Sequence, residues 1–168
     1  LFVGIKYGVD GKHVAMSIAT KVDEKIFVES IDCQSVRNGN TWIISFLKEA
    51  DIEKVVIDGS GSQQILSDEI KDYGIKLKPV LPKVSDVVVA NNMFEQAVTS
   101  SKNICHNDQP SLKQIVTNCK RRAIGTNGGF GFKAMMEEHE IALLDSVILA
   151  HWACATYKGV KKKQKISC

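Results

Sequence analysis

Lys54-Val55-Val56-Ile57-Asp58 is a short run of β-branched residues that ends in an acid and precedes Gly59-Ser60-Gly61. An unbroken apolar run of this length is typical of a strand that is buried on both faces, parallel to a neighbour and covered by helices. Asp58 would then stand at the carboxyl end of its strand, where open α/β sheets gather their ligands. Because an unpaired ionised carboxylate in apolar surroundings is costly, we expect Asp58 to face a cation. The alternative is a turn residue that caps the following helix.

The segments on either side of this strand predict an α/β domain. Residues 1–8 alternate in polarity, with Leu1, Val3, Ile5 and Tyr7 on one face and Phe2, Gly4, Lys6 and Gly8 on the other, and Asp10-Gly11 predicts a hairpin turn. We expect further strands at 13–20, 25–31 and 75–79, helices at 41–50 (capped by Thr41), 63–73, 85–100, 109–118 and 140–157, a short extended piece at 103–106 and a hairpin from 119–124 and 130–135. This order is that of the ribonuclease H-like fold, a mixed central sheet of about five strands with helices on both faces, here with a C-terminal β-hairpin and helix.

The composition predicts one soluble domain. The chain has 168 residues, of which 44% are hydrophobic and 24% charged, and we expect a domain at 1–160 and a disordered basic tail at 161–168. Five cysteines without a CxxC pair predict reduced thiols and no zinc site. No signal peptide or membrane-length apolar run occurs, which predicts a cytoplasmic protein. A strand that begins at the first residue predicts a fragment of a longer polypeptide.

A second acid stands in the last predicted helix. Asp145 lies within the apolar run Ile141-Ala142-Leu143-Leu144-Asp145-Ser146-Val147-Ile148, so it has few protein partners. A final helix packed across the carboxyl ends of the strands would bring Asp145 to Asp58. Two carboxylates there would hold Mg²⁺ or Mn²⁺, which prefer oxygen ligands. Two such ions, about 3.5 to 4 Å apart, serve in phosphodiester hydrolysis.

An ordered set of short motifs spans most of the chain. They are Phe2-Val3-Gly4-Ile5, Val56-Ile57-Asp58, Asn91-Asn92-Met93-Phe94, Ile104-Cys105-His106-Asn107-Asp108-Gln109-Pro110-Ser111-Leu112, Asn118, Lys133, and Leu144-Asp145 followed by Ala150 and Ala153. The set resembles the nuclease domain of the large terminase subunit of tailed bacteriophages, which cuts concatemeric viral DNA during packaging. No one motif is specific to that family; the order of the set carries the resemblance.

The resemblance implies three acids that jointly bind two divalent metal ions. Asp58 matches the acid that closes the fourth strand and Asp145 the acid of the last helix, but the acid of the first strand falls on Lys6. An ammonium cannot ligate a metal, and its charge repels one. Three explanations stay open: a substitution that silences cutting, a natural variant that uses another acid, or a misregistered strand. Asp10 is the nearest substitute acid, provided that its turn curls back.

Basic residues gather late in a chain whose net charge is +3. We expect Lys120, Arg121 and Arg122 to contact DNA phosphates. Lys133 matches a lysine of the family and is either a phosphate contact or a solvent-facing residue. The tail 158–165 is either solvated or a further DNA contact, and the hairpin tip 125–129 could touch DNA or gate access. His106 and His139 are either proton shuttles or local hydrogen-bonding residues.

The sequence therefore predicts a metal-dependent endonuclease domain that cuts double-stranded DNA with little sequence preference in a bacterial host cell. The resemblance implies a preceding ATPase domain, absent from this chain, and the small terminase subunit and portal as partners. Neither an ATP-binding loop nor Gly-x-Ser-x-Gly occurs. Two alternatives remain: another nuclease of this fold, such as a junction resolvase or an integrase-like strand transferase, and a domain that has lost its first acid and only clamps DNA or docks on the portal.

Overall fold

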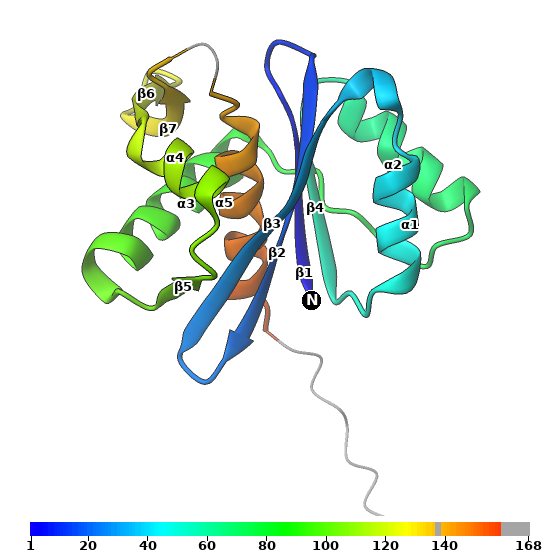
Figure 1. Cartoon of the computed structure of the whole chain (residues 1–168), viewed down its shortest axis with the longest axis horizontal. Coiled ribbons are helices and arrows are strands. Elements are labelled where there is room, and N and C mark those ends of the chain that lie inside the picture. The colour runs from blue at the N-terminus through cyan, green and yellow to red at the C-terminus, as the bar shows by residue number, and fades with distance from the viewer. Residues whose placement is uncertain (137–138, 159–168) are drawn as a thin grey trace, which may run out of the picture.

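A five-stranded mixed sheet divides the protein into two helical layers (Figure 1). The computed structural model describes residues 1–136 and 139–158. The strands lie in the order β4-β1-β2-β3-β5. Their bounds are β1 (Phe2–Tyr7), β2 (His13–Val22), β3 (Lys25–Ser35), β4 (Lys54–Asp58) and β5 (Ile104–His106). β1 is parallel to β4 and antiparallel to β2, and β3 is parallel to β5.

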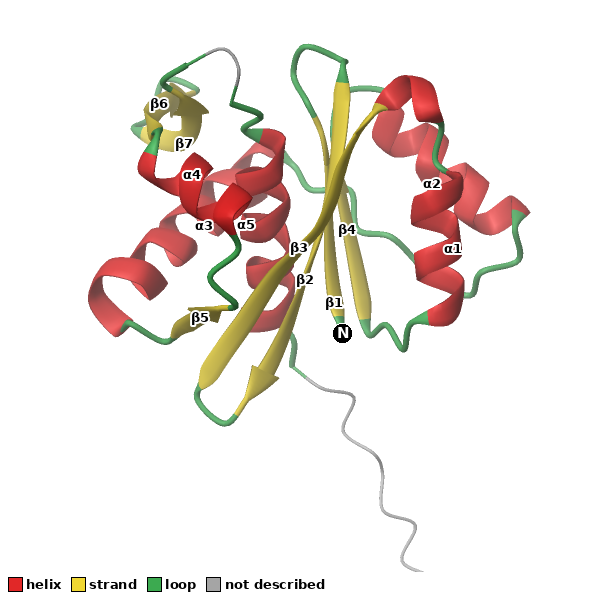
Figure 2. Ribbon diagram, in the orientation of Figure 1, coloured by secondary structure: helices red, strands yellow, loops and turns green. Residues whose placement is uncertain are grey.

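Helices cover both faces of the sheet, as Figure 2 shows. On one side lie α1 (Thr41–Glu49) and α2 (Ser62–Asp72), and on the other lie α3 (Val84–Gln96), α4 (Pro110–Thr117) and α5 (Ala142–Ala155). A short 3-10 turn (Val36–Asn38) precedes α1, and a π-helical turn (Ala97–Ser101) continues α3. β6 (Cys119–Ile124) and β7 (Gly129–Ala134) form a separate antiparallel hairpin. The predicted ribonuclease H-like architecture is confirmed.

The alternation of β1 sends its side chains into two separate cores. Val3, Ile5 and Tyr7 pack toward α1 and α2, whereas Phe2 packs with the apolar residues of α5. All six residues of β1 are buried, which is the burial expected of a central strand covered on both faces. Lys6 lies on the same face as Phe2 because side chains two apart in a strand point the same way. The sequence pattern thus forces a lysine to point toward α5.

Helix α5 lies almost directly on β1. A Cβ atom at Gly4 would lie 2.2 Å from the Ser146 carbonyl oxygen and 2.4 Å from the Ala150 backbone nitrogen. The two buried hydroxyls of Ser17 and Ser146 are 2.6 Å apart, and Ser146 Oγ also donates to the Leu143 carbonyl at 2.8 Å. These contacts join α5 to β1 and β2, and they fix where the first turn of α5 meets the end of the sheet.

Two predicted details are wrong. The segment 75–79 is not a strand; the chain makes one isolated parallel bridge nearby, between Val56 and Val80, whose backbone bonds to Ile57 and Val55 are 2.9 and 2.8 Å long. The fifth strand is Ile104–His106 instead, where the sequence indicated a short extended piece. Asn40, not Thr41, is the residue before α1. Its side chain makes no capping bond and instead joins Tyr7 to Glu69 with bonds of 2.8 Å each.

The proposed tail at 161–168 lies outside the described residues, as does the rest of the basic segment after Lys158. Within the described ranges, no helix has the length and apolar character needed to cross a membrane.

Candidate active site

Lys6 and Asp58 are direct neighbours across the sheet. The parallel register of β1 and β4 pairs Phe2 with Lys54 and continues in step to pair Lys6 with Asp58. Because both strands run in the same direction, their last residues reach the same edge of the sheet. The predicted convergence of the first and fourth strands is confirmed, and their register places Lys6 directly beside Asp58.

The Lys6 ammonium is paired with the Asp58 carboxylate. Lys6 Nζ lies 2.5 Å from Asp58 Oδ2, and the two side chains are only 11% and 19% exposed. Asp58 Oδ1 accepts no hydrogen bond from any described residue. A buried lysine costs several kcal/mol without a counter-charge, and this contact supplies one. Asp58 therefore already faces a cation, but that cation is a side chain of the protein.

Asp145 reaches the same place from the first turn of α5. It lines one pocket together with Lys6, Asp58 and Arg122. No described residue donates a hydrogen bond to its carboxylate. Burial raises the pKa of Asp145 to about 6, the charges of Lys6 and Arg122 oppose this rise, and the negative charges of Asp58 and Glu140 add to it. Asp145 is a partly buried carboxylate that accepts no hydrogen bond from the described residues.

Asn91 completes the pocket, and sequence reasoning did not single it out as a site residue. It is 2% exposed, lies on α3 and lines the same pocket as Asp145. Its Nδ2 donates to the Val87 carbonyl at 2.8 Å, which fixes the orientation of the amide. Its Oδ1 is buried and has no hydrogen-bond partner in the described part of the chain. The motif Asn91-Asn92 was visible in the sequence, but only packing distinguishes the buried amide from the exposed one.

The pocket residues fit one divalent ion better than two. Asp58 Oδ1, the Asp145 carboxylate and Asn91 Oδ1 are oxygen atoms without a described partner, and hard cations prefer such donors. The remaining oxygen of Asp58 is occupied by Lys6. Asp58 and Asp145 are the acids among the described pocket-lining residues, and Lys6 and Arg122 line the pocket beside them, so a second divalent ion would find no third carboxylate there.

Asp10 does not reach this pocket. It does not line the pocket, and instead it groups with His13 and Glu140, whose ligand atoms all lie within 4.8 Å of one another. His13 Nδ1 is 2.7 Å from Glu140 Oε2, and a Cβ at Gly8 would lie 2.9 Å from Asp10 Oδ1. The turn therefore curls toward the loop before α5, and Asp10 belongs to a separate, partly exposed polar group of metal-ligand types rather than replacing Lys6.

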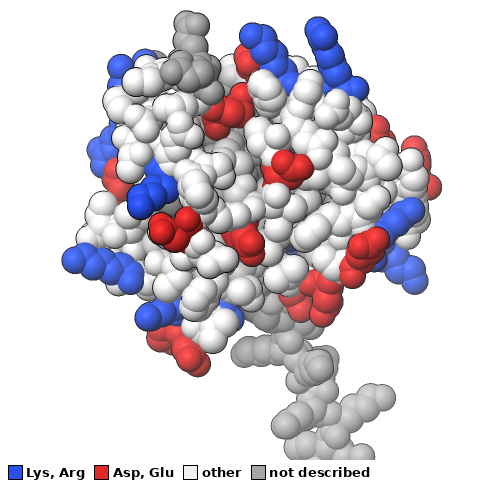
Figure 3. All heavy atoms as spheres, viewed as in Figure 1, with Lys and Arg blue, Asp and Glu red and all other residues white. Residues whose placement is uncertain are grey.

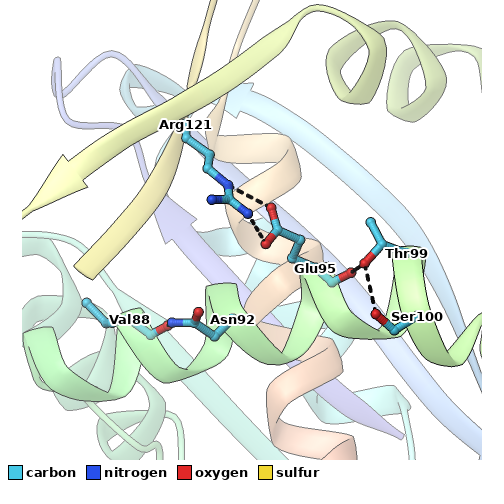
Figure 4. A network of polar contacts seen from close by, with 6 residues as sticks. All are labelled: Val88, Asn92, Glu95, Thr99, Ser100 and Arg121. Atoms are coloured by element: carbon cyan, nitrogen blue, oxygen red, sulfur yellow. Dashed lines mark hydrogen bonds and ion pairs between the residues drawn. The ribbon is translucent and has the colours of Figure 1, made fainter. Parts of the chain in front are cut away.

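The basic residues of the hairpin have two different environments. Arg122 is half-buried, lines the pocket and donates from Nε to the Phe132 carbonyl at 3.1 Å. Arg121 points to α3, where it makes a bidentate pair with Glu95, as Figure 4 shows. Its guanidinium also lies 4.3 Å from the centre of the Phe130 ring. Arg121 anchors the hairpin to α3, while Arg122 contributes charge to the pocket.

Lys120 and Lys133 are exposed and directly opposed across the hairpin. Neither makes an ion pair with a described acid. On the face seen in Figure 3, basic side chains lie mainly around the edge, with acidic ones between them, and they form no continuous basic surface. Lys120 and Lys133 are therefore the exposed, unpaired basic side chains on the described part of the hairpin.

The two histidines weighed as proton shuttles make local contacts. His106 Nδ1 accepts a hydrogen bond of 3.0 Å from the Asp108 backbone, and His139 Nε2 lies 3.1 Å from Gln114 Nε2. Neither lines the pocket of Asp58 and Asp145.

Three solved structures share this architecture. The large terminase of bacteriophage HK97 superposes with a TM-score of 0.65 at 13% identity, over 89% of this chain and 39% of that one. The chain has the fold of a large terminase nuclease domain. The SPP1 large terminase nuclease domain with bound Mn gives 0.55 at 14% identity, over 89% of this chain and 83% of that one. The large terminase nuclease from the thermophilic phage G20c gives 0.56 at 12% identity, over 94% and 82%.

The match to terminase nuclease domains confirms the resemblance of fold, and identities this low show the fold alone. The chain spans about two fifths of the HK97 protein. No protein-family model matches the chain, and no curated protein matches it. The terminase fold of this chain therefore rests on structural similarity.

Proposed function

We propose that this chain is the nuclease domain of a DNA-packaging terminase and that it hydrolyses phosphodiester bonds of double-stranded DNA. The observation that carries the proposal is the meeting of Asp58 and Asp145 in one pocket, although 86 residues separate them along the chain. This pocket lies in a fold shared with three terminase nucleases.

The roles of the pocket residues follow from their chemistry. Asp58 and Asp145 supply negative charge where a cation is needed, and Mg²⁺ or Mn²⁺ bound there would activate water and stabilise the leaving oxygen. Arg122 is a half-buried cation at the same pocket and would attract a DNA phosphate. Lys120 and Lys133 would contact the phosphate backbone, which predicts sequence-tolerant binding. Arg121 would position the hairpin through Glu95.

We further propose that the domain works as part of a longer protein, since it covers only part of the HK97 terminase. An ATPase domain, the small terminase subunit and the portal would be its partners in packaging, inside the bacterial host cell.

A second function is favoured by one observation, the Lys6–Asp58 pair. A domain whose first acid has become a lysine could clamp duplex DNA or dock on the portal without cutting. The pair neutralises one of the two acids at 2.5 Å, which lowers the attraction of the pocket for metal.

A plasmid-nicking assay with Mn²⁺ separates the two functions. We expect the natural chain to nick supercoiled plasmid, Asp58→Ala and Asp145→Ala to lose at least a hundredfold in rate, and Asp68→Ala, which removes an exposed acid on α2, to match the natural chain. Tight DNA binding without nicks in the natural chain would establish the clamping function instead. Preference for branched over linear duplexes would indicate a junction resolvase.

A further inference from the structure

Asn91 presents a buried amide oxygen with no protein partner. It is 2% exposed, and its Nδ2 is committed to the Val87 carbonyl on its own helix. The amide oxygen is therefore the free end of the side chain, and it is inaccessible to water and unpaired within the described residues. A buried carbonyl oxygen left without a partner destabilises the folded protein, so a position that keeps one calls for a missing partner.

A divalent cation is the partner that would satisfy this oxygen together with its neighbours in the pocket. The other side chains of the pocket with unsatisfied oxygen atoms are the carboxylates of Asp58 and Asp145. Two carboxylates and an amide oxygen form the kind of oxygen set that holds Mg²⁺ or Mn²⁺ in proteins. The Asn91 oxygen is neutral, so it adds a ligand without adding charge.

Lys6 supplies a positive charge in the pocket where a second metal ion would otherwise be needed. Its ammonium contacts Asp58 Oδ2 at 2.5 Å and is fixed there by the β1–β4 register. A monovalent ammonium needs less negative charge than a second divalent ion. Lys6 occupies Asp58 Oδ2, and Asp58 Oδ1 and the Asp145 carboxylate are left as oxygen ligands for one divalent ion.

We propose that this pocket binds a single divalent ion through Asp58, Asp145 and the Asn91 amide oxygen, and that the Lys6 ammonium takes the place of a second ion. The biological role of this ion rests on the proposed nuclease function. Its binding does not, because ion binding can be measured without any DNA cutting. It names a ligand, Asn91, and a stoichiometry of one.

Mn²⁺ binding to the isolated chain tests the proposal. Free Mn²⁺ is counted by electron paramagnetic resonance during titration with MnCl₂ alone. We expect one ion per chain for the natural protein, at least tenfold weaker binding for Asn91→Leu, and two ions for Lys6→Asp. Asn92→Leu is the matched control, because Asn92 makes the same 2.8 Å bond to a carbonyl four residues earlier but is exposed.

Other results overturn the proposal. Two ions in the natural chain would refute the role of Lys6, and equal affinity in Asn91→Leu and Asn92→Leu would refute the role of Asn91. Loss of the bound ion on Glu140→Gln but not on Asp145→Asn would place the ion at the group of Asp10, His13 and Glu140. If Asn91→Leu fails to fold by circular dichroism, Asn91→Asp replaces it, with at least threefold tighter binding expected.

The two hypotheses fail separately. If Asp145→Ala abolishes nicking while Asn91→Leu binds Mn²⁺ as tightly as the natural chain, the nuclease function stands and Asn91 is not a metal ligand. One Asn91-dependent ion in a chain that never nicks DNA would retain the ion site and refute the nuclease.

Discussion

Lys6 and Asp58 form an ion pair at the last residue of a central strand, with 2.5 Å between Nζ and Oδ2. Both side chains are largely shielded from water, so neither charge tolerates the loss of its partner. We predict that Asp58→Asn lowers the free energy of unfolding by about 2 to 4 kcal/mol. Urea denaturation at pH 7 measures this.

The exposed Lys71–Asp68 pair on α2 is the control, with more than half of each side chain exposed. Asp68→Asn should change stability by less than about 0.5 kcal/mol. Similar losses in the free energy of unfolding for Asp58→Asn and Asp68→Asn would show that the Lys6–Asp58 pair contributes no more to stability than an exposed ion pair.

Asp145 makes the stability of the folded protein depend on pH. Its pKa is about 6 in the folded protein, mainly through burial, against an ordinary value of 3.8. Folding therefore favours the protonated acid, and the penalty for its charged form is full above pH 6 and absent below about pH 4. We predict that Asp145→Asn is more stable than the natural chain by about 2 to 3 kcal/mol at pH 8.

That advantage should disappear at pH 4. Urea denaturation of both proteins at pH 4, 6 and 8 measures the difference directly, and the comparison cancels groups that titrate equally in both. A natural chain that is more stable than Asp145→Asn at pH 8 would contradict the burial of an unpaired acid.

Gly4 permits the close approach of β1 to α5. A methyl group there would lie within 2.4 Å of two backbone atoms of α5, which cannot move independently. We predict that Gly4→Ala costs about 3 kcal/mol or more, or prevents folding. Gly11→Ala is the comparison: Gly11 has a φ of 68° but nothing within 4 Å of its Cβ position, so about 1 kcal/mol is expected. Thermal unfolding measures the stability lost in each variant. Equal losses for Gly4→Ala and Gly11→Ala would contradict the close approach of α5 to Gly4.

The exposed hairpin lysines should contribute to DNA binding through phosphate contacts. We predict that Lys133→Ala weakens duplex binding equally for unrelated sequences and lowers the slope of log affinity against log salt by about 1. Arg121→Ala should leave that slope nearly unchanged, because Arg121 is held by Glu95. Fluorescence anisotropy between low and moderate salt measures both slopes. A larger change for Arg121→Ala would reverse this assignment.

The sequence was informative where a residue's neighbours along the chain determine its surroundings. The apolar run before Asp58 and the alternation of residues 1–8 were sufficient to place Asp58 and Lys6 at one edge of a central sheet. Asp145 stood out because its helical neighbours are apolar. These signals are local, so they are visible without coordinates.

The remaining features depend on contacts between distant segments. Asn91 and Asn92 are adjacent and chemically identical, and only the packing of α3 against the pocket makes Asn91 buried. His13 and Glu140 meet although 126 residues separate them along the chain, and nothing in either segment indicates the other. The segment 75–79 has the composition of a strand, but the single bridge beside β4 is made by the next residue, Val80, and the edge next to β3 is taken by Ile104–His106.

The initial rate at which the natural chain nicks supercoiled DNA in Mn²⁺, beside the rate of Asp145→Asn, tests the pocket most directly. The Asn variant keeps the size of the side chain and removes the charge. We expect nicking by the natural chain and a loss of at least a hundredfold in the variant. Equal rates for the two proteins would contradict the assignment of DNA cutting to this pocket.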